Sequence, residues 1–154
     1  MIEFAFSVYG TPAPQGSKRF VGHAKSGRGI MVESSKAVKP WREAVKYAAI
    51  EAMGLHTAGG ATVQLAGPLR LAVTFTLPKP KSAPKKRRTY PDRKPDLSKL
   101  VRSTEDGLVD AGIIEDDARI IDCIAAKVYP NEGLNALASP GARIAICAAG
   151  EAGR

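Results

Sequence analysis

The sequence has few aromatic residues and no long hydrophobic run, and each shortage excludes a class of protein. Aromatic residues make up 6% of the 154 residues, so we expect a core built mainly from small aliphatic side chains. No stretch approaches the roughly 20 consecutive apolar residues of a membrane span. The first ten residues, MIEFAFSVYG, lack the basic segment and the long apolar run of a signal peptide. We therefore predict a cytoplasmic protein without a membrane partner.

Cysteine and histidine are also scarce, with two of each in the chain. Cys123 and Cys147 fall in two strands that we expect to be neighbours, but a chain with two cysteines and no export signal is typical of a reducing compartment. His23 and His56 are far apart in sequence and have no second ligand nearby, which argues against a zinc site. The stretch GHAKSGRG lacks the GxxxxGK[ST] spacing of a phosphate-binding loop, so we predict no nucleotide cofactor.

Positive charge is in excess and is concentrated in one segment. The net charge is +8, and residues 79–94 contain eight cations and one aspartate. Four prolines between residues 78 and 91 prevent regular structure there. We predict a single domain over 1–154 with a mobile basic loop over 78–95, and a nucleic acid as the first candidate partner. The predicted DNA-binding cations are Lys79, Lys81, Lys85, Lys86, Arg87, Arg88, Arg93, Lys94 and Lys99.

Hydrophobic periodicity predicts a mixed domain of the α/β (α+β) class. Alternating apolar residues predict strands over 2–9, 68–78, 119–130 and 142–150, the last two forming a hairpin with a long loop. Residues 19–33 predict a separate hairpin around GHAKSGRG. Helical spacing predicts helices over 39–54 and from Asp96 to Gly112. We therefore expect a largely antiparallel sheet with two main helices on one face.

Acidic residues flank the second predicted helix. Asp96 stands at its start, and Asp116 and Asp117 follow it. Because a helix of about 15 residues is roughly 22 Å long, these carboxylates can meet only if the following strand folds back along the helix. Carboxylates that meet repel one another and need a cation, and Mg²⁺ prefers oxygen ligands. Beside a basic loop, such a site predicts metal-assisted attack on a phosphodiester, with Lys99 or Arg102 stabilising the developing charge.

Each of these features also has a purely structural explanation. A role as a helix N-cap would explain Asp96 without any metal, and a solvated turn would explain Asp116–Asp117. A basic loop can lack any partner. We expect the other acidic residues of the helix on its solvent face, paired with neighbouring cations: Glu105, Asp106 and Asp110.

Taken together, residues 94–130 resemble the signature region of the RusA family of Holliday-junction resolvases. That signature has an aspartate, a leucine, usually a second aspartate, a helix with a Lys or Arg on its second turn, a glycine, and a DD pair that enters a strand. The stretch KPDLSKLVRSTEDGLVDAGIIEDDARI follows this order. The stretches PAPQGSKRF and ESSKAVKPWREAV are also similar to phage and actinobacterial members of the family.

The resemblance assigns roles to individual residues. It implies that Asp96 is the first catalytic aspartate and Asp117 the last, with Asp116 as its neighbour and Asp96, Asp116 and Asp117 as metal ligands. Arg102 stands at the position of the catalytic lysine, and Ser98 stands where the middle aspartate is usual. A serine is a poor metal ligand beside a carboxylate. An arginine keeps the positive charge but cannot donate a proton.

The resemblance further implies a Mg²⁺-dependent homodimer, with Mn²⁺ as a substitute metal, that nicks opposing strands of branched, four-way DNA. It also implies a bacterial protein, or a phage protein that acts in the host cytoplasm. The serine leaves three outcomes open: fewer carboxylates suffice, Asp92 or Asp116 replaces the missing one, or activity is reduced. The alternative hypotheses are a catalytically impaired protein that binds branched DNA and a basic protein that associates with RNA or the ribosome.

Overall fold

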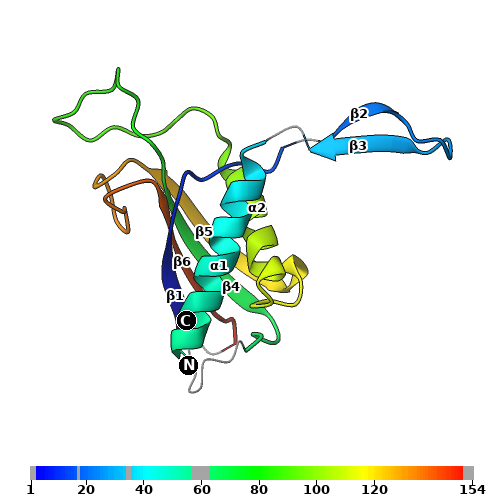
Figure 1. Ribbon diagram of the computed structural model, residues 1–154. Coiled ribbons are helices and arrows are strands. Elements are labelled where there is room, and N and C mark those ends of the chain that lie inside the picture. The colour runs from blue at the N-terminus through cyan, green and yellow to red at the C-terminus, as the bar shows by residue number, and fades with distance from the viewer. Residues whose placement is uncertain (1–2, 17, 34–35, 57–62, 151–154) are drawn as a thin grey trace.

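A computed structural model of the chain describes residues 3–16, 18–33, 36–56 and 63–150 (Figure 1). Two long helices, a short 3-10 helix and six strands make up the described structure. In chain order these are β1 (Glu3–Tyr9), β2 (Lys18–His23), β3 (Gly29–Glu33), α1 (Val38–His56), β4 (Leu69–Thr76), α2 (Leu97–Asp110), η1 (Asp117–Arg119), β5 (Ile120–Val128) and β6 (Gly141–Ala148). Neither long helix has a stretch apolar enough to cross a membrane.

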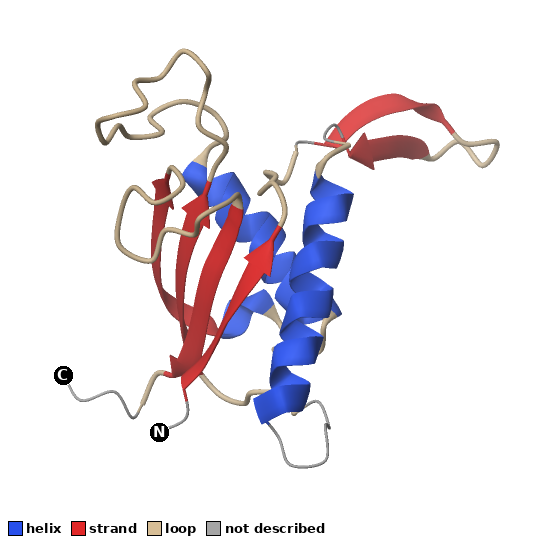
Figure 2. Ribbon diagram, turned by 60° about the vertical axis from the view of Figure 1, so that its left-hand side comes forward, coloured by secondary structure: helices blue, strands red, loops and turns tan. Residues whose placement is uncertain are grey.

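Four strands form the main sheet in the order β1-β6-β4-β5. β6 pairs antiparallel with β1 and with β4, whereas β5 pairs parallel with β4. Both helices cover the same face of this sheet (Figure 2). The predicted α+β class, the largely antiparallel sheet and the placement of the helices are therefore confirmed.

The predicted hairpin of β5 and β6 is wrong, because β4 lies between them. α2 carries the chain back across the sheet after β4, so β5 returns parallel to β4, as crossover connections require. β6 alternates buried Ala142, Ile144 and Ile146 and belongs in the middle of the sheet, while β5 exposes Ile121 and Ile124 and belongs at its edge. The two cysteines are therefore not on neighbouring strands, and both are free thiols.

The core lies between the covered face of the sheet and the two helices. Trp41 and Phe75 are its largest fully buried side chains, with ring centroids 6.4 Å apart, so the core is more aromatic than the composition predicted. The Trp41 Nε1–H donates to Thr104 Oγ1 at 3.1 Å and joins α1 to α2. The helices pack closely at Gly107, where an added Cβ would stand 2.9 Å from Val45 Cβ. α2 is thereby held against α1, and its other side faces the edge of the sheet.

Two features project from this body at the end where α1 and α2 begin (Figure 1). β2 and β3 form a separate antiparallel pair, which confirms the predicted hairpin. The proline-rich segment between β4 and α2 forms a loop on the other side of the helices, next to the connection between β5 and β6 (Figure 1). Both features flank the first turn of α2.

Candidate active site

Asp96 begins α2, but its carboxylate does not cap the helix. The residue has an extended backbone, with φ −67° and ψ 134°, and its side chain accepts no capping hydrogen bond. The carboxylate lies 3.7 Å from the Lys99 ammonium, and about half of each side chain is exposed. The predicted role of Asp96 at the helix start is confirmed, while the expectation that its carboxylate serves the cap is wrong. The carboxylate is thus open to a ligand from solvent.

A hollow of about 400 Å³ opens beside Asp96. The backbone N–H of Gln15 donates to the carbonyl of Lys99 at 3.0 Å and holds the segment after β1 against the first turn of α2. Cations and a carboxylate therefore share one concave surface. The residues that line it are Pro14, Gln15, Gly16, Lys94, Pro95, Asp96 and Lys99.

Asp116 and Asp117 form a second acidic group at η1. Asp116 Oδ1 accepts a hydrogen bond from Ala118 N at 2.9 Å, and this bond lowers the pKa of Asp116. A hydrogen bond between the two carboxyl groups lowers the pKa of Asp116 further and raises that of Asp117. Of the two carboxyl groups, Asp117 therefore keeps its proton to the higher pH. Both residues are exposed.

Glu105 and Asp106 on α2 face Asp117, which the sequence reasoning missed. Burial, followed by the charges of Asp117 and Asp106, raises the pKa of Glu105 to about 7, although the charge of Arg102 acts in the opposite direction. We call Glu105, Asp106, Asp116 and Asp117 the acidic corner. The sequence did contain a signal, because residues three and four positions after Arg102 share its face of the helix. The expectation that these carboxylates lie on a freely solvated face is wrong for Glu105, which is partly buried.

Asp96 and the acidic corner lie at different heights along α2. β5 runs back along the helix, as the sequence argument required, and near its end the Lys127 ammonium donates to the carbonyls of Arg93 and Pro95 at 2.9 and 3.0 Å. Asp117 precedes β5 and therefore lies at the other end of the strand, beside Glu105. Asp96 and Glu105 are nine positions apart along the chain, which corresponds to about 13 Å along the helix axis.

Because of this separation, the structure does not bring Asp96, Asp116 and Asp117 into one group. Across the described residues, no three acidic, histidine or cysteine side chains are placed to hold a metal ion together. Ser98 and Arg102 are exposed and lie on α2 between the two acidic groups. The site is thus an extended strip along α2, with the hollow at one end and the acidic corner at the other.

The basic loop is tied to the loop after β5 through Glu132, another residue that the sequence reasoning missed. Glu132 forms an ion pair with Lys79 and accepts a hydrogen bond from Thr89 N at 2.8 Å. The Lys79 hydrogen bond, followed by the Thr89 bond, lowers the pKa of Glu132. The side chain of Lys79 is only 16% exposed, and its ammonium is therefore occupied within the protein.

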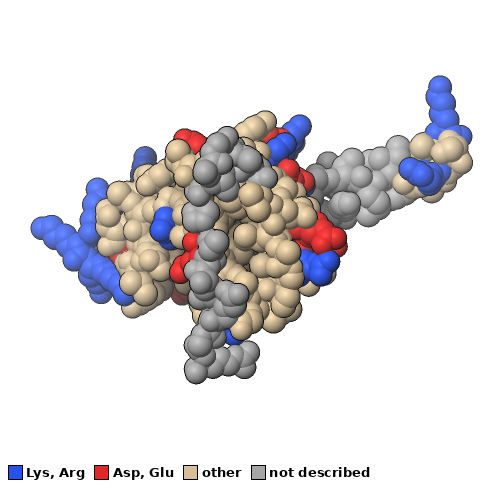
Figure 3. All heavy atoms as spheres, turned by 90° about the horizontal axis from the view of Figure 1, so that it is seen from below, with Lys and Arg blue, Asp and Glu red and all other residues tan. Residues whose placement is uncertain are grey.

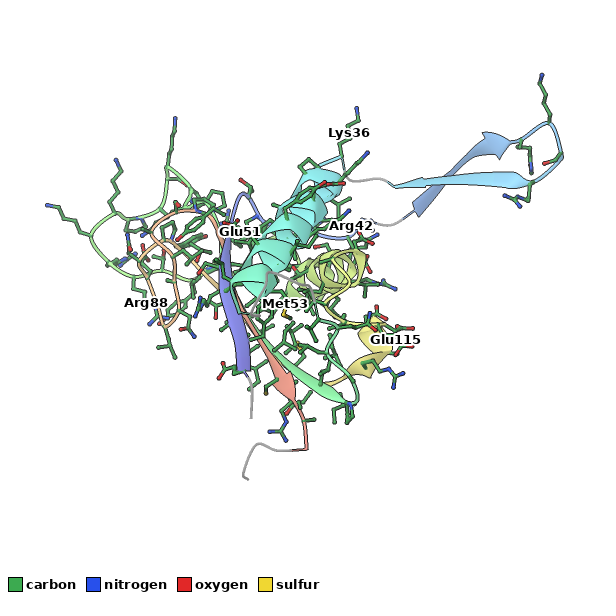
Figure 4. All side chains as sticks on the ribbon, turned by 60° about the horizontal axis from the view of Figure 1, so that its bottom comes forward. Lys36, Arg42, Glu51, Met53, Arg88 and Glu115 are labelled. Atoms are coloured by element: carbon green, nitrogen blue, oxygen red, sulfur yellow. The ribbon has the colours of Figure 1, made fainter. Side chains whose placement is uncertain are left out.

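The other predicted DNA-binding cations face solvent. These exposed side chains are Lys81, Lys85, Lys86, Arg87, Arg88, Arg93, Lys94 and Lys99. Arg88 stacks over the ring of Tyr90, 4.8 Å from its centroid. In Figure 4, Arg88 in the basic loop lies well apart from Glu115 beside the acidic corner. The cations of the loop are therefore nearer to the Asp96 end of the strip than to the acidic corner.

A protein-family model matches most of the chain. The family model for endodeoxyribonuclease RusA matches residues 10–135, which include β2, β3, both long helices, the basic loop and all of the strip along α2. No curated protein sequence matches the chain.

Proposed function

Because the chain belongs to the RusA family of endodeoxyribonucleases, we propose that it resolves four-way DNA junctions by metal-dependent, paired nicking of opposing strands. The observation that carries the proposal is the family match, which spans Asp96, Arg102 and Asp117 together. The exposed carboxylates along α2 and the cations on either side of the hollow support it. They suit a substrate that is polyanionic and is cut at a phosphate.

The acidic corner offers the oxygen ligands that a hard divalent ion prefers, although no three of the described side chains are placed to hold such an ion together. The pKa of Glu105 is raised to about 7, and that of Asp117 is also raised, in each case partly by neighbouring carboxylates that a cation would neutralise. We propose Asp116 and Asp117 as ligands of Mg²⁺, with Mn²⁺ as a substitute, and Glu105 as the nearest carboxylate able to supply what Ser98 lacks. Asp96 lies about 13 Å along α2 from Glu105, so in our proposal it would bind a separate ion. When bound, the ion would polarise the phosphate and lower the pKa of an attacking water.

The remaining residues of the strip bind and orient the DNA. Arg102 is a permanent cation on the exposed face of α2, so in our proposal it stabilises the charge that develops on the phosphate and leaves proton transfer to a carboxylate or water. Lys99 holds the Asp96 carboxylate at the edge of the hollow. The cations of the basic loop bind phosphates beyond the hollow, which makes affinity fall steeply with salt. Two such sites in a homodimer, acting in the cytoplasm, would cut the two opposing strands.

A nicking assay on a fixed four-way junction tests the proposal. Wild type should give paired, symmetric nicks with Mg²⁺ and none without it. Asp96→Asn and Asp117→Asn should lose the nicks while junction binding is retained or tightened, because repulsion of the phosphate falls. Asp110→Asn is the matched control, since Asp110 lies at the end of α2 and pairs with Arg42 outside the strip. If both aspartate variants still cut, the site assignment is wrong.

A second candidate function is junction binding without cleavage. Ser98 is exposed on the first turn of α2, and the described acidic residues include no group of three that could hold a metal. Tight binding without nicks in either Mg²⁺ or Mn²⁺ would favour this function. Ser98→Asp would then be expected to create activity, which separates an impaired nuclease from a protein that never cuts DNA.

A further inference from the structure

The β2–β3 pair forms a ribbon that projects away from the body (Figures 1 and 2). Its two strands pair only with each other, from Lys18 opposite Glu33 to His23 opposite Gly29. A strand of six residues extends about 20 Å. An irregularity between Phe20 and Gly22 shifts the register, and such bulges increase the twist of a ribbon. A two-stranded ribbon is marginally stable by itself, so a surface that supports it is expected.

The ribbon starts beside the candidate active site. Gly16, two residues before β2, lines the same hollow as Asp96 and Lys99. The Gln15–Lys99 backbone hydrogen bond fixes this segment to the first turn of α2. The distance from the hollow to the tip of the ribbon is therefore set by the length of the strands.

The tip of the ribbon is a hydrogen-bonded turn that carries two cations. Ala24 N donates to the carbonyl of Arg28, and Gly27 N donates to the carbonyl of Ala24, both at 2.8 Å. Gly27 has φ +84°, a conformation that favours glycine. Lys25 and Arg28 are exposed, and neither forms an ion pair with any described residue. Figure 3 shows basic side chains at the end of the projecting ribbon.

The composition of the ribbon also favours an anionic partner. Residues 18–33 contain four cations and one carboxylate. The B-DNA major groove, roughly 12 Å wide, admits a two-stranded β-ribbon. A protein partner of the same shape would have to supply acidic residues to match the tip, whereas a duplex supplies a phosphate every ~3.4 Å along each strand.

We propose that the ribbon lies along one DNA arm of the junction and that Lys25 and Arg28 contact phosphates about six base pairs from the cut. The inference rests on the proposed function, because it takes the hollow beside Asp96 as the place where the junction strand is cut. Contact at the tip makes the binding affinity depend on the length of the DNA arm, whereas contact at the basic loop does not. Affinity should therefore rise once a DNA arm is long enough to reach the tip.

The test uses junctions whose four arms are closed by hairpin loops and range from about 4 to about 14 base pairs, a span that brackets the expected reach. Binding of the full chain is measured by fluorescence anisotropy. The variant Lys25→Ala/Arg28→Ala removes two cations at the tip. The matched control Lys85→Ala/Lys86→Ala removes two exposed cations from the basic loop. Sedimentation of each protein without DNA reports its oligomeric state.

We expect the tip variant to bind long-armed junctions more weakly than wild type, and the difference to vanish when the arms are too short to reach the tip. Loss of two phosphate contacts per protomer, or four in a homodimer, should reduce the salt slope by about 3.6, so the deficit should shrink about a hundredfold between about 50 and 200 mM salt. The basic-loop variant should lose affinity for arms of every length.

Three outcomes would overturn the inference. A tip variant that binds like wild type at every length places no DNA contact at the tip. A tip variant that changes the oligomeric state without DNA shows that the ribbon docks on a second copy of the chain instead. A wild-type protein that neither binds nor nicks a long-armed junction defeats the proposed function itself, and that result is distinguishable because it involves no variant.

Discussion

Glu105 offers a quantitative test of the acidic corner, because its carboxyl group should destabilise the fold when it ionises. Its pKa rises from 4.5 to about 7, first through burial and then through Asp117 and Asp106. The folded state therefore holds this proton more tightly than the unfolded state does. The contribution of Glu105 to stability is therefore full below about pH 4.5, falls as the pH rises to about 7, and does not change above that pH.

The magnitude follows from the size of this change. Without any screening by water, a rise in the pKa of Glu105 from 4.5 to about 7 corresponds to about 3 kcal/mol of lost stability at alkaline pH. Because Glu105 is only partly buried, screening by water reduces this figure to about 1–2 kcal/mol. Roughly 1 kcal/mol of that loss should fall between about pH 5 and about pH 8.

Urea denaturation of wild type and Glu105→Gln in EDTA, at about pH 5 and about pH 8, measures this effect. Glu105→Gln should be more stable than wild type, and its advantage should be about 1 kcal/mol larger at the higher pH. Glu51→Gln removes an exposed carboxylate from α1 and serves as the control, with the same difference from wild type at both pH values. An advantage for Glu105→Gln that does not grow with pH would refute the reasoning.

Three further variants test the packing and the basic loop. Gly107→Ala should gain about 1 kcal/mol in helix propensity but lose more by pressing on buried Val45, which should lower the melting temperature by about 2–6 °C in calorimetry. Trp41→Phe loses the buried hydrogen bond to Thr104 and should cost about 1–2 kcal/mol in denaturant unfolding. Glu132→Gln raises the net charge by one yet should weaken junction binding in anisotropy, since it releases the base of the basic loop; tighter binding would show that charge alone matters.

Local patterns in the sequence predicted the elements of the fold but not all of their partners. The alternation around Phe4 and Phe6 and the helical spacing around Trp41 each identify an element, because the pattern repeats within a few residues. The place of β6 depends on which strands it joins across more than sixty residues of chain, and periodicity carries no such information. The false hairpin of β5 and β6 followed from assuming that neighbours in sequence are neighbours in the sheet.

The site was predicted in part for the same reason. The resemblance located Asp96, Arg102 and Asp117 by their order along the chain. The approach of Glu105 to Asp117 depends on how β5 runs back beside α2, and the pairing of Glu132 with the basic loop depends on two connections that meet only in the folded chain. Nothing in the sequence predicts the contact between Glu132 and the basic loop, because Glu132 is a single charged residue between a proline and a turn that contains glycine.

The position of β6 also bears on how the protein is made. β1 is the first strand of the described chain and β6 the last, yet the only main-sheet partner of β1 is β6. During synthesis β1 therefore remains unpaired until residues 141–148 have left the ribosome. Until then, its apolar side chains Phe4, Phe6 and Val8 cannot pack as part of a sheet. Folding that depends on so distant a contact is slow and exposes a free strand edge to aggregation.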